Sequence, residues 1–432
     1  MSFNEWHRVR IKDVFELIPG FAFKSKDFSE NGIPVIKIKN VKELRLLDRD
    51  FSYIDPKYLE TKSRFTTKKG DLLISMTGNR IEGSMSSWVG KVCRINSDKK
   101  YLINQRVGIL RLSNESYSDK FFLYLLASEE IQKKLISIAT SSGGQANISP
   151  DQIKSLEFSI PCFEEQKAIA HILSTLDDKI EVNNEINKTL ENMAQVIFKQ
   201  WFVDFEFPNE DGEPYKSSGG EMVESELGMI PKGWEVKKVE QVTKIIRGAS
   251  PRPIQDFIRD EGIPWVKISD ASSSNTRFIS STKEFIKEEG RKKSREVKVG
   301  TLILSNSATP GIPMIMKIDA CVHDGWLIFD EFREVTKEYM FHFLTENRIG
   351  ILSLSNGSVF RNLKTDILKN YKIIIPSRDV VVRVDNIFKS INNSIDNIEN
   401  QITTLTKIRD GLLTKLMSGE IRVPLDEEGD VS

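Results

Sequence analysis

The chain has 432 residues, more than a single compact core usually holds, and its hydrophobic content of 39% is that of a globular protein. Its 62 basic and 62 acidic side chains cancel, and no apolar run is long enough to cross a bilayer. The three cysteines lie far apart and there are only four histidines, which argues against a disulfide framework or a structural zinc site. We therefore expect two or three folded units in a reducing cytoplasm, with no membrane segment.

The zero net charge conceals a segregation along the chain. Residues 1–160 carry 26 basic and 19 acidic side chains, and residues 231–376 carry 24 and 18. Residues 161–230 carry 5 basic against 15 acidic side chains, and residues 377–432 carry 7 against 10. Solvated surface charge is one explanation. The other is two domains that face a polyanion, separated by segments that avoid it.

The two basic blocks repeat the same phrases in the same order. NGIPVIKIKN (31–40) recurs as EGIPWVKISD (261–270), KKGDLLIS (68–75) as KVGTLILS (298–305), and NISPDQIKSLEFSIP (147–161) as NLKTDILKNYKIIIP (362–376). The offset falls from 230 to 215 residues, so the second copy has lost about fifteen residues, as loops tolerate. We interpret the chain as a tandem duplication, with similar α+β domains at 1–160 and 231–376.

A long helix is predicted after each copy, over 161–204 and 377–418. Apolar residues recur there in alternating steps of four and three, which is the seam of a coiled coil. The seam positions are Ile169, Leu173, Leu176, Ile180, Asn183, Asn187, Leu190, Ala194, Ile197 and Trp201 in the first helix, and Val384, Phe388, Ile391, Ile395, Ile398, Ile402, Leu405, Arg409, Leu412 and Leu416 in the second. The matching registers favour pairing of the two helices, and an antiparallel pair would relate the two halves by a pseudo-twofold axis.

Three remaining features complete this plan. The segment 205–230 is rich in Pro, Gly, Ser and Glu and is interpreted as a linker, and 419–432 as a C-terminal tail. Asn183 and Asn187 interrupt the first seam. They either fix the register of the helix pair or mark a position where a second protein packs.

Motifs of the common enzyme classes are absent from the sequence. There is no GxxxxGKS/T phosphate loop, no GxGxxG opening a helix, no GxSxG, no HExxH and no Asn-Pro-Pro-aromatic stretch. The histidines have no metal-ligand spacing, although His323 in ACVHDGW lies in an expected loop and is a candidate ligand contact. We expect no catalytic residues and no metal site in this chain.

Polar loops that contain glycine follow several expected strands, among them SMTGNRIEGSMSS (75–87), SSGGQANIS (141–149) and SNGSVFRN (355–362). Gln, Asn and Arg pair with base edges, and glycine lets the backbone approach phosphate closely. Plain structural turns explain these loops equally well, and Ser149-Pro150 has the form of a helix N-cap followed by proline. Because the two copies differ most in these loops, a DNA-binding interpretation predicts two different short targets.

The candidate DNA contacts combine these loops with the lysines and polar side chains near strand ends. They are Lys37, Lys39, Asn40, Ser75, Thr77, Gly78, Asn79, Arg80, Gln105, Arg106, Ser142, Gly143, Gly144, Gln145, Lys267, Ser269, Asn306, Ser307, His323, Asn356, Ser358, Phe360 and Arg361.

The sequence resembles the specificity subunit of a Type I restriction-modification enzyme. The resemblance covers nearly the whole chain. It is carried by the duplicated plan, the helix segment from IPCFEEQKAIAHIL to FKQWF, the LGMIPKGWEV phrase (227–236) and the terminal GLLTKLMSGEIRVP. It implies two target-recognition domains, each reading half of an asymmetric split site on double-stranded DNA, and two helices that set the spacer between the half-sites.

The resemblance also implies partners and cofactors. The helix residues would serve both helix–helix packing and docking of two modification (methyltransferase) subunits, and restriction/translocase subunits would join the complex. S-adenosylmethionine, ATP and Mg would belong to those partners, with no cofactor in this chain. The segment from Pro161 to Gln166 becomes Pro376-Ser-Arg-Asp-Val-Val in the second copy, so the two docking sites need not be equivalent.

Other interpretations of the duplicated plan remain open. A free-standing bipartite DNA-binding or architectural protein would bind its site without partners and would need no exposed apolar surface on its helices. A coiled-coil scaffold for proteins would lack the steep salt dependence of phosphate contacts. A self-contained methyltransferase would methylate DNA alone.

Overall fold

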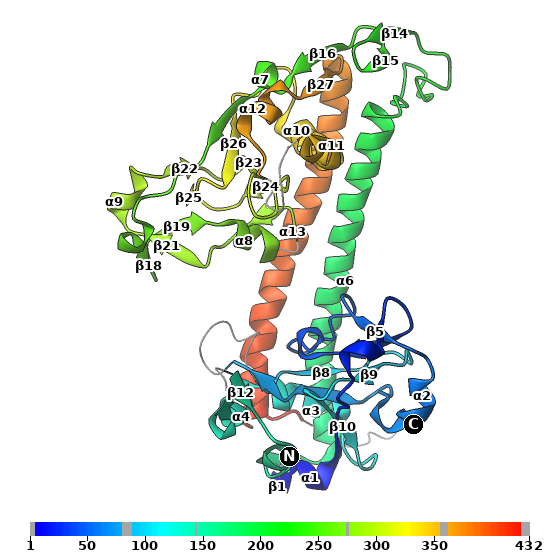
Figure 1. The fold of residues 1–432 in the computed structure, drawn as a ribbon, viewed down its shortest axis with the longest axis vertical. Coiled ribbons are helices and arrows are strands. Elements are labelled where there is room, and N and C mark those ends of the chain that lie inside the picture. The colour runs from blue at the N-terminus through cyan, green and yellow to red at the C-terminus, as the bar shows by residue number, and fades with distance from the viewer. Residues whose placement is uncertain (1–4, 80–88, 143–144, 274–275, 355–361, 425–432) are drawn as a thin grey trace. The chain divides into compact units, whose positions relative to one another are not determined.

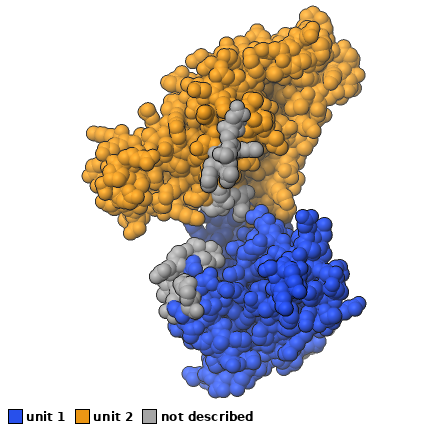
Figure 2. All heavy atoms as spheres, in the orientation of Figure 1, with its two compact units in different colours: residues 1–182, 402–432 blue, residues 183–401 orange. Residues whose placement is uncertain are grey.

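The computed structural model describes residues 5–79, 89–142, 145–273, 276–354 and 362–424. The chain forms two compact units, one of residues 1–182 with 402–432 and the other of residues 183–401 (Figure 2). Each unit contains one α+β domain and one segment of each long helix (Figure 1). Among the described residues, no helix is both long enough and apolar enough to cross a membrane.

The first domain is built on two four-stranded sheets. One has the order β2 (Phe15–Pro19), β10 (Val107–Leu112), β6 (Leu72–Ser75), β8 (Val92–Arg94), and the other β3 (Phe28–Ser29), β5 (Ser52–Ile54), β4 (Ile33–Ile36), β9 (Leu102–Ile103). A pair β1 (His7–Arg10) with β13 (Glu157–Ile160) and a small sheet β11 (Thr140–Ser142), β12 (Gln145–Asn147), β7 (Thr77–Gly78) complete the strands. Its helices are α1 (Ile11–Val14), α2 (Tyr58–Thr61), α3 (Asp119–Ala127), α4 (Glu129–Ile138) and α5 (Pro150–Lys154).

The second domain repeats the strand order of these two sheets and adds one edge strand to each, β20 and β22. Its sheets are β17 (Lys244–Arg247), β26 (Trp326–Asp330), β23 (Leu302–Ser305), β24 (Pro313–Met316), β20 (Phe278–Ile279), and β18 (Ile258–Arg259), β21 (Glu284–Ile286), β19 (Ile263–Val266), β25 (Ala320–Val322), β22 (Arg295–Val297), with the pair β16 (Glu235–Lys238) and β27 (Lys372–Ile375). Its helices are α7 (Val239–Val242), α8 (Ile268–Ser273), α9 (Glu288–Arg291), α10 (Lys337–Glu346), α11 (Arg348–Ser353) and α12 (Thr365–Asn370). The predicted duplication is therefore present in the strand order of the two domains.

Strand pairing locates the residues that the second copy lacks. Equivalent positions are 230 residues apart at β6 and β23, and 221 apart at β8 and β24. The offset is 219 at β10 and β26 and 215 at β13 and β27. Most of the shortening thus falls in the loop after β6, one of the polar loops singled out as a candidate DNA contact, while the sheets keep their registers.

The repeated Gly-Ile-Pro step has a backbone explanation. Gly32 and Gly262 have φ of +134° and +137°, a region that residues with a side chain rarely adopt. A Cβ at Gly32 would lie 2.2 Å from the carbonyl oxygen of Ile54, and one at Gly262 would lie 2.7 Å from that of Ile286. The phrase recurs because both domains need glycine where β4 and β19 begin beside a neighbouring strand.

The two predicted long helices are α6 (Phe163–Phe202) and α13 (Arg378–Met417), each of 40 residues. They lie antiparallel within each unit (Figure 1). In the first unit Arg409 Nη1 donates to Asp177 Oδ1 at 2.8 Å, and in the second Asn183 Nδ2 donates to Gln401 Oε1 at 3.3 Å. Arg409 is the polar residue that breaks the second seam, and Asp177 compensates its charge.

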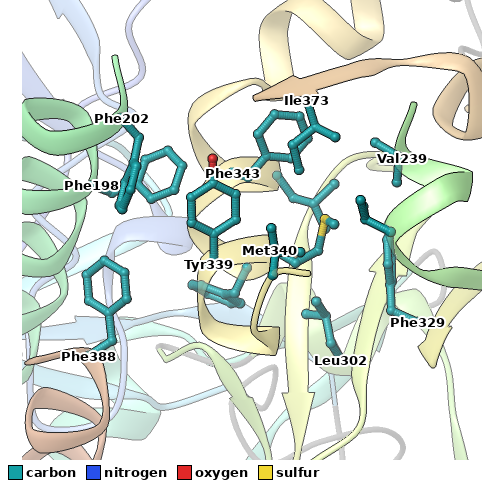
Figure 3. Packing of buried hydrophobic residues seen from close by; sticks show 14 of the residues in the cluster. Phe198, Phe202, Val239, Leu302, Phe329, Tyr339, Met340, Phe343, Ile373 and Phe388 are labelled. Carbon is teal, nitrogen blue, oxygen red and sulfur yellow. The ribbon is translucent and has the colours of Figure 1, made fainter. Parts of the chain in front are cut away.

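In the second unit the helices share one apolar core with the domain. Phe198 and Phe202 of α6 and Phe388 of α13 belong to the same buried cluster as Tyr339 of α10 and Phe329 of the sheet (Figure 3). The Phe202 and Tyr339 rings meet edge to face at 4.8 Å between centroids. The helices are therefore part of the domain's core rather than a separate rod attached to it.

The connection over residues 205–230 is folded. Phe205 and Phe207 are buried against Trp234, and the Phe207 ring stacks on Trp234 at 5.0 Å and on Tyr215 at 4.6 Å. A hairpin of β14 (Met222–Ser225) and β15 (Gly228–Pro231) follows. The polar, proline-rich composition suggested a linker, but aromatic side chains within the segment pack against Trp234 and hold it in place.

Candidate DNA interface

The first domain gathers candidate residues from three distant segments. Strand β7 pairs with β12, which sets Gly78 opposite Ala146 and Thr77 opposite Asn147. Thr77 Oγ1 donates to Asn147 Oδ1 at 2.8 Å. Asn79 is exposed at the end of β7. The small sheet therefore joins the loop after β6 to the glycine-containing loop that precedes α5.

The turn between β9 and β10 adds two more candidates to this cluster. Gln105 and Arg106 are exposed there, and the Arg106 carbonyl accepts a hydrogen bond from the Met76 N–H at 2.8 Å. Arg106 Nη1 donates to Gln145 Oε1 at 2.9 Å. An arginine paired with an amide in this way still has free N–H groups that can reach a base edge or a phosphate.

The second domain gathers its candidates around Gly325. Asn306 N–H donates to the Gly325 carbonyl at 2.8 Å. A Cβ at Gly325 would lie 2.1 Å from His323 Cε1 and 2.7 Å from Ser307 Oγ, so all three residues meet at this turn. Ser269 is exposed on α8, next to Ile268, whose N–H lies 3.2 Å from His323 Nε2.

His323 is held in its neutral form by its surroundings. Burial lowers the pKa of its imidazole, and nearby Asp324 opposes this shift in part. The backbone N–H groups of Gly325 and Ile268 face its two ring nitrogens, Nδ1 at 2.7 Å and Nε2 at 3.2 Å. A neutral ring can accept from one of these N–H groups and a protonated ring from neither, so this geometry favours a neutral His323 that holds the loop rather than one that offers a positive charge.

Three of the buried candidates hydrogen-bond to the backbone through their side chains. Asn40 accepts from the Lys37 N–H and donates to the carbonyls of Leu47 and Arg49. Ser75 Oγ accepts from the Lys91 N–H at 2.9 Å. Asn306, 4% exposed, donates Nδ2 to the Asp324 carbonyl. As placed here, these side chains support the loops and do not face solvent, contrary to what direct base contact requires.

The lysines of the repeated phrase differ in availability. Lys37 Nζ donates to Ser52 Oγ and lies 4.2 Å from the centre of the Phe28 ring, and burial lowers the pKa of its ammonium group. Lys267 pairs with Glu284. Lys39 is exposed, which makes it the better phosphate candidate of the first copy.

The sequence interpretation missed a basic turn after β17. Arg247 Nε donates to the Asp324 carbonyl at 2.9 Å, and Ser250 Oγ donates to Asp324 Oδ1 at 2.6 Å. Arg252, with a side chain 79% exposed, lies 3.5 Å from Asp324 Oδ2. The phrase RGASPRP at a strand end was the available signal, because it adds two arginines to a polar turn.

Part of the candidate set lies outside the described residues: Arg80, Gly143, Gly144, Asn356, Ser358, Phe360 and Arg361. Ser142 is described by its backbone in β11. Within the described ranges, no group of His, Cys, Asp and Glu residues has the arrangement of a metal site.

Comparison with known proteins identifies the family of this duplicated architecture. A family model described as the Type I restriction modification DNA specificity domain matches residues 4–192 and 231–407. The two matches correspond to the two copies and cover most of the chain. The chain belongs to this family.

Proteins similar in sequence carry the same designation. The Type I restriction enzyme HindI specificity subunit of Haemophilus influenzae is 26% identical, over 97% of this chain and 100% of that protein. The MjaIX specificity subunit of Methanocaldococcus jannaschii is 26% identical, over 97% of this chain and 94% of its own. The S subunit of a Type I restriction-modification system from M. genitalium has a similar fold, with a TM-score of 0.54 at 17% identity and 96% coverage of each chain.

The faces of the two long helices differ in exposure. The sixteen predicted packing and docking positions are buried or half-buried in the structure: Leu173, Leu176, Ile180, Asn183, Asn187, Leu190, Ile197, Trp201, Phe388, Ile391, Ile395, Ile398, Ile402, Leu405, Leu412 and Leu416. Asn183 and Asn187 are 1% and 4% exposed, and Asn183 contacts the sister helix. The burial of both asparagines and the contact of Asn183 with α13 agree with the interpretation that they lie within the helix pair.

An additional apolar stripe lies on the outside of α6. Ile186, Met193 and Val196 of α6 and Val203, the residue directly after the helix, are 39%, 50%, 63% and 44% exposed. Their spacing of seven, three and seven residues keeps them on one helix face. None of these four residues is among the packing and docking positions predicted from the sequence.

Glu165 and Gln166, in the first turn of α6, form hydrogen bonds with other parts of this chain. Glu165, 2% exposed, accepts from Nε and Nη2 of Arg422, and Gln166 links Ser118 to Pro161 through its side-chain amide. In the first copy of the family repeat, the Pro161–Gln166 segment therefore anchors the segment around Arg422 and the domain to α6. Its loss in the second copy is a difference in internal anchoring.

Proposed function

We propose that this chain is the DNA-sequence-specificity subunit of a Type I restriction-modification complex. Its two domains would each read one half of an asymmetric, bipartite site on double-stranded DNA. The observation that carries this proposal is the pairing of one scaffold with two different loop sets: Arg106, Gln145 and Asn79 in the first domain, and Ser307, Ser269 and Arg252 in the second.

The boundaries proposed for these roles are those of the repeat. The target-recognition domains would span 1–160 and 231–376, the spacer helices 161–204 and 377–418, and the folded connection 205–230 lies between them, with a C-terminal tail at 419–432. The net positive charge of both domains supports contact with the phosphate backbone, and the negative charge of 161–230 keeps that segment away from it.

Partner binding is proposed for the helices. Two modification subunits and the restriction/translocase subunits would dock on the chain. The exposed apolar stripe on α6 supports such docking, because a free-standing DNA-binding protein needs no such surface. Methyl transfer from S-adenosylmethionine and ATP- and Mg-dependent cleavage would belong to those partners, and the complex would act on DNA in the cytoplasm.

Methylation mapping tests this proposal directly. The chain is expressed with its neighbouring modification subunit, and parallel cultures carry either protein alone. We expect methylated adenines in a split, asymmetric motif only when both are present. Absence of such methylation, with a partner that co-purifies in stable form, would contradict the modification role and favour the free-standing binder.

A further inference from the structure

A buried arginine fastens the second domain to both long helices. Arg277, 5% exposed, immediately precedes β20. Its backbone N–H and Nε donate to Glu191 Oε1 of α6 at 3.3 and 3.2 Å, and Nη1 donates to Asn392 Oδ1 of α13 at 2.9 Å. One side chain therefore connects a sheet edge with two helices.

The surroundings of Arg277 hold its guanidinium in one orientation. The group lies 4.6 Å from the centre of the Phe341 ring on α10. Asn392 donates its amide to Glu338 of α10, which is 8% exposed. A planar guanidinium can satisfy Glu191 and Asn392 in two fixed directions at once, which neither lysine nor an apolar residue can do.

Strand β20, which follows Arg277, connects this attachment to β24 and so to the recognition loop, the loop between β23 and β24 that contains Ser307. The Arg277 carbonyl accepts from the Ile315 N–H at 2.9 Å, and β20 pairs with β24 in parallel. Strand β24 begins directly after the loop that contains Ser307. Lys317, at the other end of β24, pairs with Asp396 of α13. Both attachments therefore meet the C-terminal half of β24, the strand that begins where this loop ends.

The first domain is attached by different chemistry. Its matching segment bridges Leu44 to Cys93, and Glu43 there pairs with Lys91 inside the domain. Its contact with the helices runs through α3, where Tyr124 Oη donates to Asp177 Oδ2 at 2.6 Å. The arginine attachment is therefore not a general requirement of the duplicated scaffold.

We propose that Arg277 is a positioning residue that sets the orientation of the second domain's recognition loop on the helix pair, and thereby the spacer length accepted before the second half-site. This inference rests on the proposed function. Its consequence concerns spacing rather than the bases read, because the Arg277 side chain contacts α6, α13 and α10 and none of the exposed side chains of the loop.

The test uses the full chain with the modification subunit and a DNA library in which the split site carries different spacer lengths. The readout is the ratio of methylation at the preferred spacer to that at spacers one base pair longer or shorter. For Arg277→Met we expect this ratio to fall by about tenfold, as contacts of this coupling strength imply, with the half-site bases unchanged. Asn392→Ala, which removes the α13 contact alone, should give a smaller fall.

Arg94→Met is the matched control. Arg94 pairs with Asp119 at 2.7 Å inside the first domain and contacts neither long helix in the described ion pairs, so its loss should lower stability without changing the ratio. If Arg277→Met does not accumulate, Asn392→Ala and Glu191→Gln decide the question. An unchanged ratio in these variants, while the wild type methylates the split site, overturns the positioning role alone; failure of the wild type to methylate overturns the proposed function.

Discussion

At the scale of single residues, burial separates side chains that build the recognition loops from those that can reach DNA. Asn40 and Asn306 look like base-reading amides in the sequence, but their amide groups hydrogen-bond to carbonyls inside their own domains. Arg106 and Gln145 remain exposed and meet each other from segments 39 residues apart. A side-chain amide or guanidinium can contact DNA only when it is exposed and its N–H groups are not all used in hydrogen bonds within the domain.

Arg106 provides a test of the first-domain cluster. Arg106→Ala should weaken binding of the complex to its cognate site by about 1–3 kcal/mol if the side chain reads a base. Arg106→Lys retains the charge and should keep the salt dependence while losing base discrimination. Affinity measured against salt concentration checks both. Arg10→Ala, which removes an exposed pair with Glu157 on the β1–β13 pair, is the control and should bind like the wild type.

His342 predicts a specific pH dependence of stability. Burial, together with the charge of Arg277, lowers the pKa of His342 to about 3, and its ring packs against Phe388 at 4.4 Å. The pKa of this histidine is higher in the unfolded chain, about 6.5, so the unfolded chain takes up the proton first as the pH falls. The free energy of unfolding therefore decreases below about pH 6.5, by about 2 kcal/mol at pH 5. His342→Phe keeps an aromatic ring but cannot titrate. Thermal unfolding at pH 7 and pH 5 should show a smaller drop in Tm for the variant; equal drops would contradict the assignment.

At the scale of elements, the apolar seam accounts for the pairing of α6 and α13. Its period brings Leu173 and Val384 into buried positions, and its one charged residue, Arg409, meets Asp177 across the pair. Asn187 is the exception, because both its amide atoms are buried without a partner among the described contacts. Such a residue lowers stability and favours one register of the pair.

Asn187→Leu should therefore stabilise the helix pair. Removing a buried, unsatisfied amide is expected to raise the free energy of unfolding by about 1–3 kcal/mol. Asn183→Leu is the matched comparison, because Asn183 has Gln401 as a partner and its replacement leaves that partner without a contact. Chemical denaturation of the two variants checks the contrast; a less stable Asn187→Leu protein would show that the amide is satisfied in solution.

At the scale of the whole molecule, one scaffold is used twice with different loops. The four strands that the matching sheets share keep the same order in both copies, while the offset between the copies changes most in the loop after β6. Each domain also has its own attachment to the helices, through Tyr124 in one and Arg277 in the other. Recognition and attachment are thus separable within each half.

Exchange of one half should change one half-site. Replacing residues 1–160 with the corresponding domain of a relative should alter the bases methylated on one side of the spacer and leave the other side unchanged. The donor must supply a hydroxyl that reaches Asp177, as Tyr124 does at 2.6 Å. A donor carrying phenylalanine at that position is the control and should accumulate less. Simultaneous change of both half-sites would show that the domains do not read independently.

The sequence alone determined the duplication, the paired helices and the family resemblance. Each repeated phrase and each stretch of apolar periodicity is a short run of neighbouring residues, which can be recognised without knowing which residues contact one another in the fold. Loop roles depend instead on distant partners. Only the tertiary structure placed Arg106 beside Gln145, buried Asn306 behind Gly325, and connected Arg277 to Glu191 and Asn392. The physical reason is that burial and hydrogen bonding are set by residues far away in the chain, which no local pattern encodes.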